Sequence, residues 1–248
     1  SRTQLCPVRP SNHYHMGGIP TNAFGEVQGS AGQIVPGLFA VGECACASFH
    51  GFNRLGTNSL LELLTMGRYV GERVESYLSE KQVSAPKGAG EASLARFSSY
   101  LAGAGKENVG RVRLDMRDMM TRKVGVFRHE KGVGEAIQEL LTFKERAEKT
   151  SVSVRDARWN QELLERWELD NLLDNAMTIA QGALLRKESR GAHFREDYPV
   201  RSDDFQYHTL VSMTEFGKVT FGRRLIDMSL FEAKGEYSDH FKIIPRKY

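Results

Sequence analysis

The sequence lacks several features that would indicate a protein class directly. Its three cysteines, Cys6, Cys44 and Cys46, are too few for a disulfide framework and lack the spaced second pair of a zinc site, so we expect no metal site. No apolar run approaches the ~18–20 residues of a membrane-spanning helix. The net charge of +3 is too small to indicate nucleic acid as the main partner. A globular protein of a reducing compartment is therefore favoured.

The beginning of the chain also carries no targeting signal. Ser1 leads at once into structured-looking sequence, without a signal or transit pattern. With 40% apolar and 26% charged residues, the composition is that of a folded protein and argues against wholesale disorder. We therefore expect a chain that starts in the middle of a larger polypeptide or assembly.

Composition and periodicity divide the chain into four parts. Residues 1–80 are glycine-rich and end in a helical pattern, and residues 81–93 are a polar, Pro- and Gly-broken linker. Residues 94–190 have helical spacing almost throughout, strongest from 159 to 187, where both tryptophans are expected in the core. Residues 191–248 begin as a loop and continue with short strands expected at 207–213, 218–225 and 226–230. The pattern predicts a mixed α and β fold.

The most informative stretch for chemistry is residues 13–64. A strand at Ile34–Val41 leads into Gly42-Glu43, and a glycine loop then leads into a helix for which Asn58 or Ser59 is a good N-cap. Leucines at 60, 61 and 64 are expected to form the apolar face of this helix, and Gly67 and Gly71 to pack closely on a sheet. A strand, a carboxylate turn and a helix N-terminus together are typical of nucleotide or flavin sites, since the helix offers free N–H donors.

Three segments make a more specific resemblance: HYHMGGIPT at 13–21, GLFAVGECACASFHGFNRLGTNSLLEL at 37–63, and RKESRGAHFREDYP at 186–199. In order and spacing they resemble the C-terminal part of the flavoprotein subunit of succinate dehydrogenase and fumarate reductase. This implies the C-terminal part of an FAD-binding α/β domain, a helical domain and a small α+β C-terminal region. The family's N-terminal half would carry a GxGxxG entry, and no GxGxxG occurs in the 248 residues.

The resemblance also implies roles for individual residues. It puts His13 and Arg54 at the dicarboxylate substrate as catalytic and binding groups, where Arg54 can hold a carboxylate bidentately. It puts Glu43 at the ribityl or ribose hydroxyls of FAD. Ser59 and Leu60, with Asn58 beside them, would lie at the flavin ring edge. The implied reaction is hydride transfer between succinate and flavin N5.

The resemblance further implies partners. These are the N-terminal half of the flavoprotein (as a separate chain or a missing segment), an iron–sulfur subunit and, through the complex, membrane anchor subunits passing electrons to a quinone. The expected place is peripheral, on the cytoplasmic face of a bacterial inner membrane or the matrix side of the mitochondrial inner membrane.

Several alternatives stay open at the level of sequence. L-aspartate oxidase shares HGxNRL and ESRG-like motifs, but its relatives usually have Cys-Gly-Gly where this chain has Met16-Gly17-Gly18. A non-catalytic assembly subunit is the other alternative. His50 either belongs to the site or orders its turn. Arg190 and His193 follow a long helix, where positive side chains suit the C-terminal end of the helix dipole.

Overall fold

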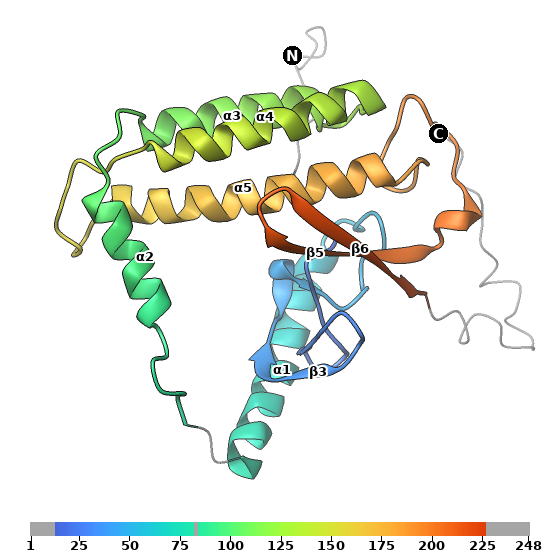
Figure 1. Cartoon of the computed structure of the whole chain (residues 1–248). Coiled ribbons are helices and arrows are strands. Elements are labelled where there is room, and N and C mark those ends of the chain that lie inside the picture. The colour runs from blue at the N-terminus through green and yellow to red at the C-terminus, as the bar shows by residue number, and fades with distance from the viewer. Residues whose placement is uncertain (1–12, 82–83, 227–248) are drawn as a thin grey trace, which may run out of the picture.

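The computed structural model of the chain describes residues 13–81 and 84–226 (Figure 1). Short strands and the long helix α1 form one part, the helices α2–α5 a second, and the hairpin β5–β6 a third. The expected mixed α and β fold is confirmed. The domain division at 80, 93 and 190 stays a prediction. None of the helices in the described ranges has the length and apolarity to cross a bilayer.

Two small sheets lie at the N-terminal end. The antiparallel pair joins β2 (Glu26–Gln28) to β3 (Ile34–Phe39), so the expected strand is found over most of its length. The parallel pair joins β1 (Ile19–Pro20) to β4 (Ala45–Cys46). The 3-10 turn Gly42–Cys44 lies between β3 and β4 and carries Glu43. This arrangement brings the HYHMGG segment beside the carboxylate turn.

Helix α1 (Asn58–Glu80) follows the glycine loop. Its N-cap is Thr57, with a left-handed φ of 68° and no side-chain cap, so the expectation of Asn58 or Ser59 as the cap was wrong. The expected apolar face is also largely uncovered by this chain, although Val70 is buried. A Cβ added at Gly67 or Gly71 would meet no atom within 4 Å, so the described residues do not make the expected close packing. The exposed apolar side chains of α1 are Leu60, Leu61, Leu63, Leu64, Tyr69 and Leu78.

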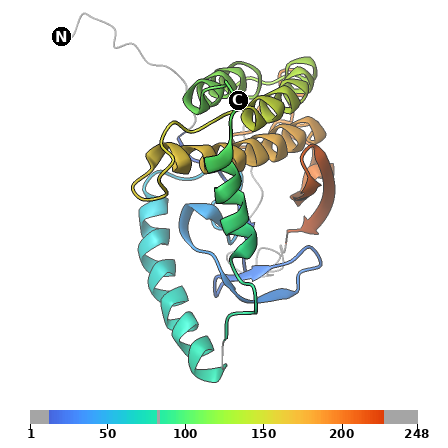
Figure 2. The same ribbon diagram turned by 60° about the vertical axis from the view of Figure 1, so that its left-hand side comes forward.

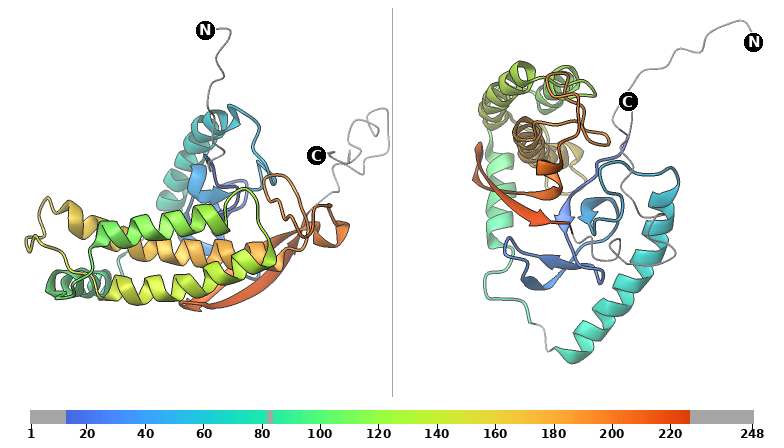
Figure 3. Two further views of the ribbon diagram at one scale, coloured as in Figure 1. Left: turned by 90° about the horizontal axis from the view of Figure 1, so that it is seen from above. Right: turned by 90° about the vertical axis from the view of Figure 1, so that its right-hand side faces the viewer.

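The helical part consists of α2 (Glu91–Ala102), α3 (Val109–Lys123), α4 (Glu130–Glu148) and α5 (Gln161–Leu185). Helices α3, α4 and α5 run side by side as a bundle, with α5 below α3 and α4 in the view of Figure 1 (see also Figure 3). Helix α1 points away from this bundle (Figure 2). The main core lies between these three helices, and its largest fully buried apolar side chains include Val112, Met119, Val133, Leu140, Leu169, Leu173 and Met177.

Polar side chains begin three of these helices by accepting a backbone N–H three residues ahead. Asn108 begins α3, His129 begins α4 and Asn160 begins α5. These caps supply acceptors to N–H groups that have no partner within the helix. Trp159, directly before the last cap, is fully exposed with a φ of 54°, so its expected place in the core was wrong. Trp167 lies at the edge of the core, against Phe97.

The C-terminal strands form an antiparallel hairpin of β5 (Tyr207–Glu215) and β6 (Lys218–Leu225). Both match the expected positions. Phe216, in the turn between β5 and β6, packs against the helical core together with Met213 and Val219. Of the third expected strand, at 226–230, only Ile226 lies within the described residues, and it is not in a strand.

Candidate functional site

Arg54 lies where the glycine loop meets the beginning of α1. Its Nη1 donates a hydrogen bond to the Ser59 Oγ at 2.6 Å, which ties the guanidinium to the first turn of the helix. The guanidinium carbon also lies 4.4 Å from the ring centre of Tyr14, a cation–π contact. Two fixed neighbours therefore orient a partly buried cation that retains further N–H donors.

His13 is next to Tyr14 in the chain, and Tyr14 contacts Arg54. The His13 side chain is exposed, while the adjacent Tyr14 packs on Arg54. Burial, followed by the charge of Glu62, raises the pKa of the Tyr14 hydroxyl, so this group stays protonated at neutral pH. The structure thus places His13 next in the chain to a residue that contacts Arg54, and it shows no hydrogen bond or ring contact between the two expected substrate residues, both of which lie in the described ranges.

The expected flavin contacts surround the N-terminus of α1. Gly42, with a φ of 79°, packs so tightly on this helix that an added Cβ would lie 2.6 Å from the Leu63 Cδ2. The next residue, Glu43, is exposed and free to accept hydroxyl hydrogen bonds. At the helix end Asn58 is half-buried, Ser59 buried and Leu60 exposed.

These residues fit an FAD molecule. The first turn of α1 has no side-chain cap. The Asn58 and Leu60 N–H groups donate to the carbonyl oxygens of Leu55 and Thr57, so the Ser59 N–H is the donor of this turn that could serve an electron-rich ring or phosphate. Gly18, with a φ of 130°, allows the HYHMGG segment to approach the carboxylate turn, because an added Cβ would lie 2.4 Å from the Cys44 carbonyl oxygen. An exposed carboxylate turn beside a helix end without a side-chain cap therefore fits a flavin, and the two glycine contacts hold these parts together.

A buried pair adjoins Arg54. His50 Nε2 lies 2.6 Å from Glu62 Oε2, and the two side chains are only 8% and 5% exposed. The His50 ring also meets the Tyr14 ring edge to face at 5.4 Å. The sequence left the role of His50 open and missed Tyr14 and Glu62. The available signal was the single acid in the leucine-rich first turns of α1 (LLELL).

The RGAH segment packs directly on the loop that carries Arg54. The Ala192 N–H donates to the Phe52 carbonyl oxygen at 2.9 Å. Gly191, with a φ of 58°, permits this approach, since an added Cβ would lie 2.5 Å from the same oxygen. The Phe52 ring in turn lies under the guanidinium of Arg186 at 4.6 Å. Residues far apart in the sequence thus support one loop.

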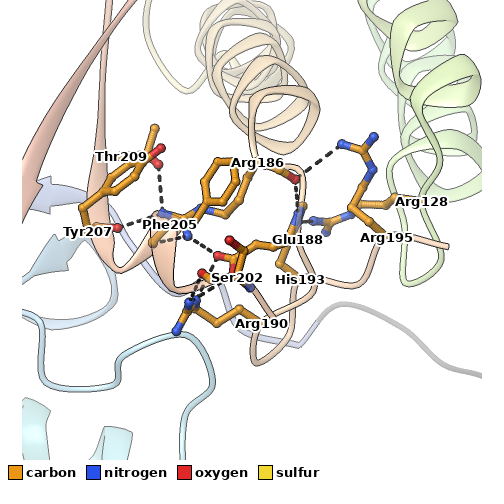
Figure 4. Close-up of polar contacts among 10 residues, drawn as sticks. All are labelled: Arg128, Arg186, Glu188, Arg190, His193, Arg195, Ser202, Phe205, Tyr207 and Thr209. Atoms are coloured by element: carbon orange, nitrogen blue, oxygen red, sulfur yellow. Dashed lines mark hydrogen bonds and ion pairs between the residues drawn. The ribbon is translucent and has the colours of Figure 1, made fainter. Parts of the chain in front are cut away.

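A buried ionic cluster holds this segment in place (Figure 4). Arg195, fully buried, donates to the carbonyl oxygens of Ala183 and Leu184 at the C-terminal end of α5. His193 Nε2 lies 3.1 Å from the Arg186 carbonyl oxygen. His193 therefore bonds to the end of α5, but as a neutral ring and not as the expected positive side chain, because its pKa is lowered to about 4. Arg190 has a different role, since it pairs with the buried carboxylate of Glu188.

The lowered pKa of His193 predicts that the stability of the chain depends on pH. Burial, assisted by the charge of Arg128, lowers the pKa of His193 to about 4, and its Nδ1 lies 2.9 Å from the Arg128 Nη1, as an acceptor would. The folded chain therefore binds this proton only near pH 4, whereas the unfolded chain binds it near pH 6.5. Falling pH thus removes stability between these values, by about 3 kcal/mol in all.

The check is urea unfolding of wild type and His193→Gln at pH 7, 6, 5 and 4.5. The variant should lose less stability over this range than wild type, whatever its stability at pH 7. Equal losses in the two proteins would contradict the role assigned to His193.

The cysteines make no ligand cluster in the described part of the chain. Cys44 is exposed and Cys46 half-buried, both as free thiols, and Cys6 lies outside the described residues. In residues 13–81 and 84–226 there is no group of three His, Cys, Asp or Glu side chains arranged to hold a metal ion.

Comparison with known families agrees with this geometry. Residues 2–60 match the model of the FAD binding domain, and residues 113–248 match that of the fumarate reductase flavoprotein C-terminus. The chain belongs to the succinate dehydrogenase and fumarate reductase flavoprotein family. Its cofactor class is therefore FAD.

Similar proteins span bacteria and plants. The succinate dehydrogenase flavoprotein subunit of Rickettsia bellii is 37% identical over 96% of this chain, and the mitochondrial ubiquinone-type subunit of rice is 39% identical over 93%. A solved Escherichia coli quinol fumarate reductase chain superposes with a TM-score of 0.77 at 33% identity over 86% of this chain. These relatives are named succinate dehydrogenase or fumarate reductase, which does not favour the L-aspartate oxidase alternative.

The chain spans only part of these relatives. It covers 40% of the Rickettsia subunit, 38% of the rice subunit and 37% of the E. coli chain. The family is therefore clear, while the activity of a whole flavoprotein needs residues beyond this chain.

Proposed function

We propose that this chain is the C-terminal portion of an FAD-dependent flavoprotein that interconverts succinate and fumarate. The observation that carries the proposal is Arg54, whose guanidinium is tied to Ser59 and to the Tyr14 ring beside the uncapped end of α1. A fixed cation next to a flavin-binding surface is what a dicarboxylate substrate requires.

In this proposal Arg54 binds one carboxylate of the substrate and His13 donates a hydrogen bond to the other. Together they would align the central C–C bond of the substrate. FAD, when bound, would supply the acceptor for the hydride that leaves one methylene carbon of succinate. The proton from the neighbouring carbon goes to a base outside this chain, so succinate loses two electrons and two protons in becoming fumarate.

The flavin would be held by the residues around the helix end. Glu43 would accept hydrogen bonds from ribityl or ribose hydroxyls, and Asn58, Ser59 and Leu60 would lie at the ring edge. The partial positive charge at the N-terminus of α1 would stabilise negative charge on the ring.

The uncovered face of α1 supports a completing segment, the N-terminal half of the flavoprotein, as a separate chain or the preceding part of the same one. Leu60, Leu61 and Leu64 are 59–77% exposed, an unusual density for one face of a helix. Through that flavoprotein, the further partners are an iron–sulfur subunit and membrane anchor subunits. The position would be peripheral, on the cytoplasmic face of a bacterial inner membrane or the matrix side of the mitochondrial one.

The test is purification of the native particle, with denaturing intact-mass analysis, a visible absorption spectrum and oxidation of succinate by a dye. We expect flavin absorbance, a companion or longer polypeptide, and succinate oxidation. Oxidation of L-aspartate in place of succinate would support an aspartate oxidase. A flavin-containing particle that oxidises neither would indicate an assembly subunit.

A further inference from the structure

The buried pair of His50 and Glu62 lies one helical turn from the residue that holds Arg54. Ser59 and Glu62 are three residues apart on α1, so both side chains leave the same face of the helix. Ser59 holds Arg54, and Glu62 holds His50. The loop that carries Arg54 is therefore tied to α1 at two places.

The pair also reaches the other side of Arg54 through an aromatic ring. Tyr14 contacts His50 edge to face with an interplanar angle of 83°, and it carries the Arg54 guanidinium at 4.4 Å. A continuous series of contacts thus leads from Glu62 through His50 and Tyr14 to Arg54. Each member restricts the next, since an edge-to-face ring pair and a cation–π contact both have preferred geometries.

Burial of the Glu62 carboxylate destabilises the fold unless the carboxylate has a partner. An unpaired ionised group at 5% exposure would be strongly destabilising, so Glu62 depends on His50 for its stability. The contact pairs a carboxylate oxygen, which can accept, with a ring nitrogen that can donate. The buried His50 Nδ1 has no hydrogen-bond partner among the described residues. Such an arrangement costs stability, which suggests a task beyond packing.

We propose that His50, held by Glu62, is a positioning residue that fixes Tyr14 and thereby the direction in which Arg54 meets the substrate. This inference rests on the proposed function, because it assigns a task to the surroundings of the proposed substrate arginine. A displacement of about 1 Å in such a group can lower turnover by about 100-fold without removing any group that touches the substrate.

Two exchanges of His50 separate its contact to Glu62 from its ring contact to Tyr14. His50→Gln keeps an amide donor near the place of Nε2 but has no ring, whereas His50→Asn has no ring and is also too short to reach Glu62. In the assembled, FAD-loaded enzyme, both variants should lose about 10- to 100-fold in kcat for succinate, because both lack the ring that restricts Tyr14. The Gln variant should retain more thermal stability than the Asn variant, because Glu62 keeps a partner, and both should retain the flavin spectrum.

Tyr14 gives an independent second test. Tyr14→Phe keeps the ring and its contacts to His50 and Arg54, whereas Tyr14→Leu removes the ring. We expect the Leu variant to reproduce the loss seen in His50→Asn and the Phe variant to remain close to wild type. The matched control is His129→Asn, at the N-cap of α4, where asparagine is itself a good capping residue; its kcat and KM should equal those of wild type.

The outcomes separate this inference from the proposed function. A wild-type enzyme that does not oxidise succinate would overturn the proposed function. An active wild type whose His50→Asn and Tyr14→Leu variants keep normal kcat and KM per bound flavin would overturn only the positioning role. Lower thermal stability with normal kinetics of the flavin-loaded fraction would likewise assign His50 and Glu62 to folding alone.

Discussion

Exchange of Arg54 for lysine should lower kcat/KM for succinate by about 100- to 1,000-fold in the assembled enzyme, with the flavin still bound. Lysine keeps the charge but has no planar fork of donors, so it cannot hold a carboxylate bidentately and donate to the Ser59 Oγ as well. It would also lose the flat contact of the guanidinium with the Tyr14 ring. Steady-state oxidation of succinate by a dye measures the effect, normalised to flavin absorbance.

The matched control is Arg68→Lys on the same helix. Arg68 is 84% exposed and pairs with Glu72 one turn further on, so its exchange should change neither turnover nor flavin content. If Arg54→Lys retained more than a tenth of wild-type kcat/KM, the guanidinium would not be the substrate clamp. His13 would then be the remaining candidate of the two.

The largest effect on stability is expected for Asp170→Asn, in the middle of α5. The Asp170 carboxylate accepts from the Tyr100 hydroxyl and lies 3.0 Å from Arg166 and 3.2 Å from Lys144. Burial would raise its pKa, but the hydrogen bond from Tyr100 and the charge of Arg166 outweigh burial and lower the pKa to about 2. The amide would leave the Arg166 guanidinium, 7% exposed, without a compensating charge.

Breaking a buried pair in this way costs about 3–5 kcal/mol, whereas an exposed pair contributes at most about 1 kcal/mol. Asp118→Asn on α3 is the matched control, since its contact to Arg122 is 4.0 Å long and well exposed. Urea unfolding of both variants at pH 7 measures the difference. A loss below about 1 kcal/mol for Asp170→Asn would mean that solvent reaches this cluster.

The sequence predicted those parts of the fold that local chemistry decides. Strands β3, β5 and β6 and helix α5 follow from hydrophobic period and turn residues, both of which act over a few residues. Trp159 was misplaced because a helical stripe was extended past its cap by one residue. At that position the backbone has already left the helix.

Burial was harder to predict than secondary structure. The leucines of α1 have a pattern that calls for a covering surface, yet most of them lie exposed in this chain. Period and spacing indicate that a face must be covered but not which segment covers it. Expected and observed burial therefore differ for these leucines because local sequence does not identify the surface that covers them.

The candidate site also has a part that the sequence supplied and a part that it did not. The family resemblance supplied His13, Arg54, Glu43, Asn58, Ser59 and Leu60, whose roles remain predictions. It did not supply the contact between His50 and Glu62, because a side-chain pair between a loop and a helix face depends on the tertiary path of the loop. Nor did it supply Arg195 as the donor to the end of α5, since ESRGAH drew attention to its neighbours.

The packing of the C-terminal region on the glycine loop has a consequence for synthesis. Ser48, just before HGFNRLG, bonds to His208 on β5, which follows it by 160 residues. At a translation rate of about 5–20 residues per second, the ribosome needs on the order of 8–32 s to supply that partner. During this time the loop has left the ribosome without its support. Early binding of a nascent-chain chaperone to this stretch, or slow capture of the cofactor after synthesis ends, would follow directly.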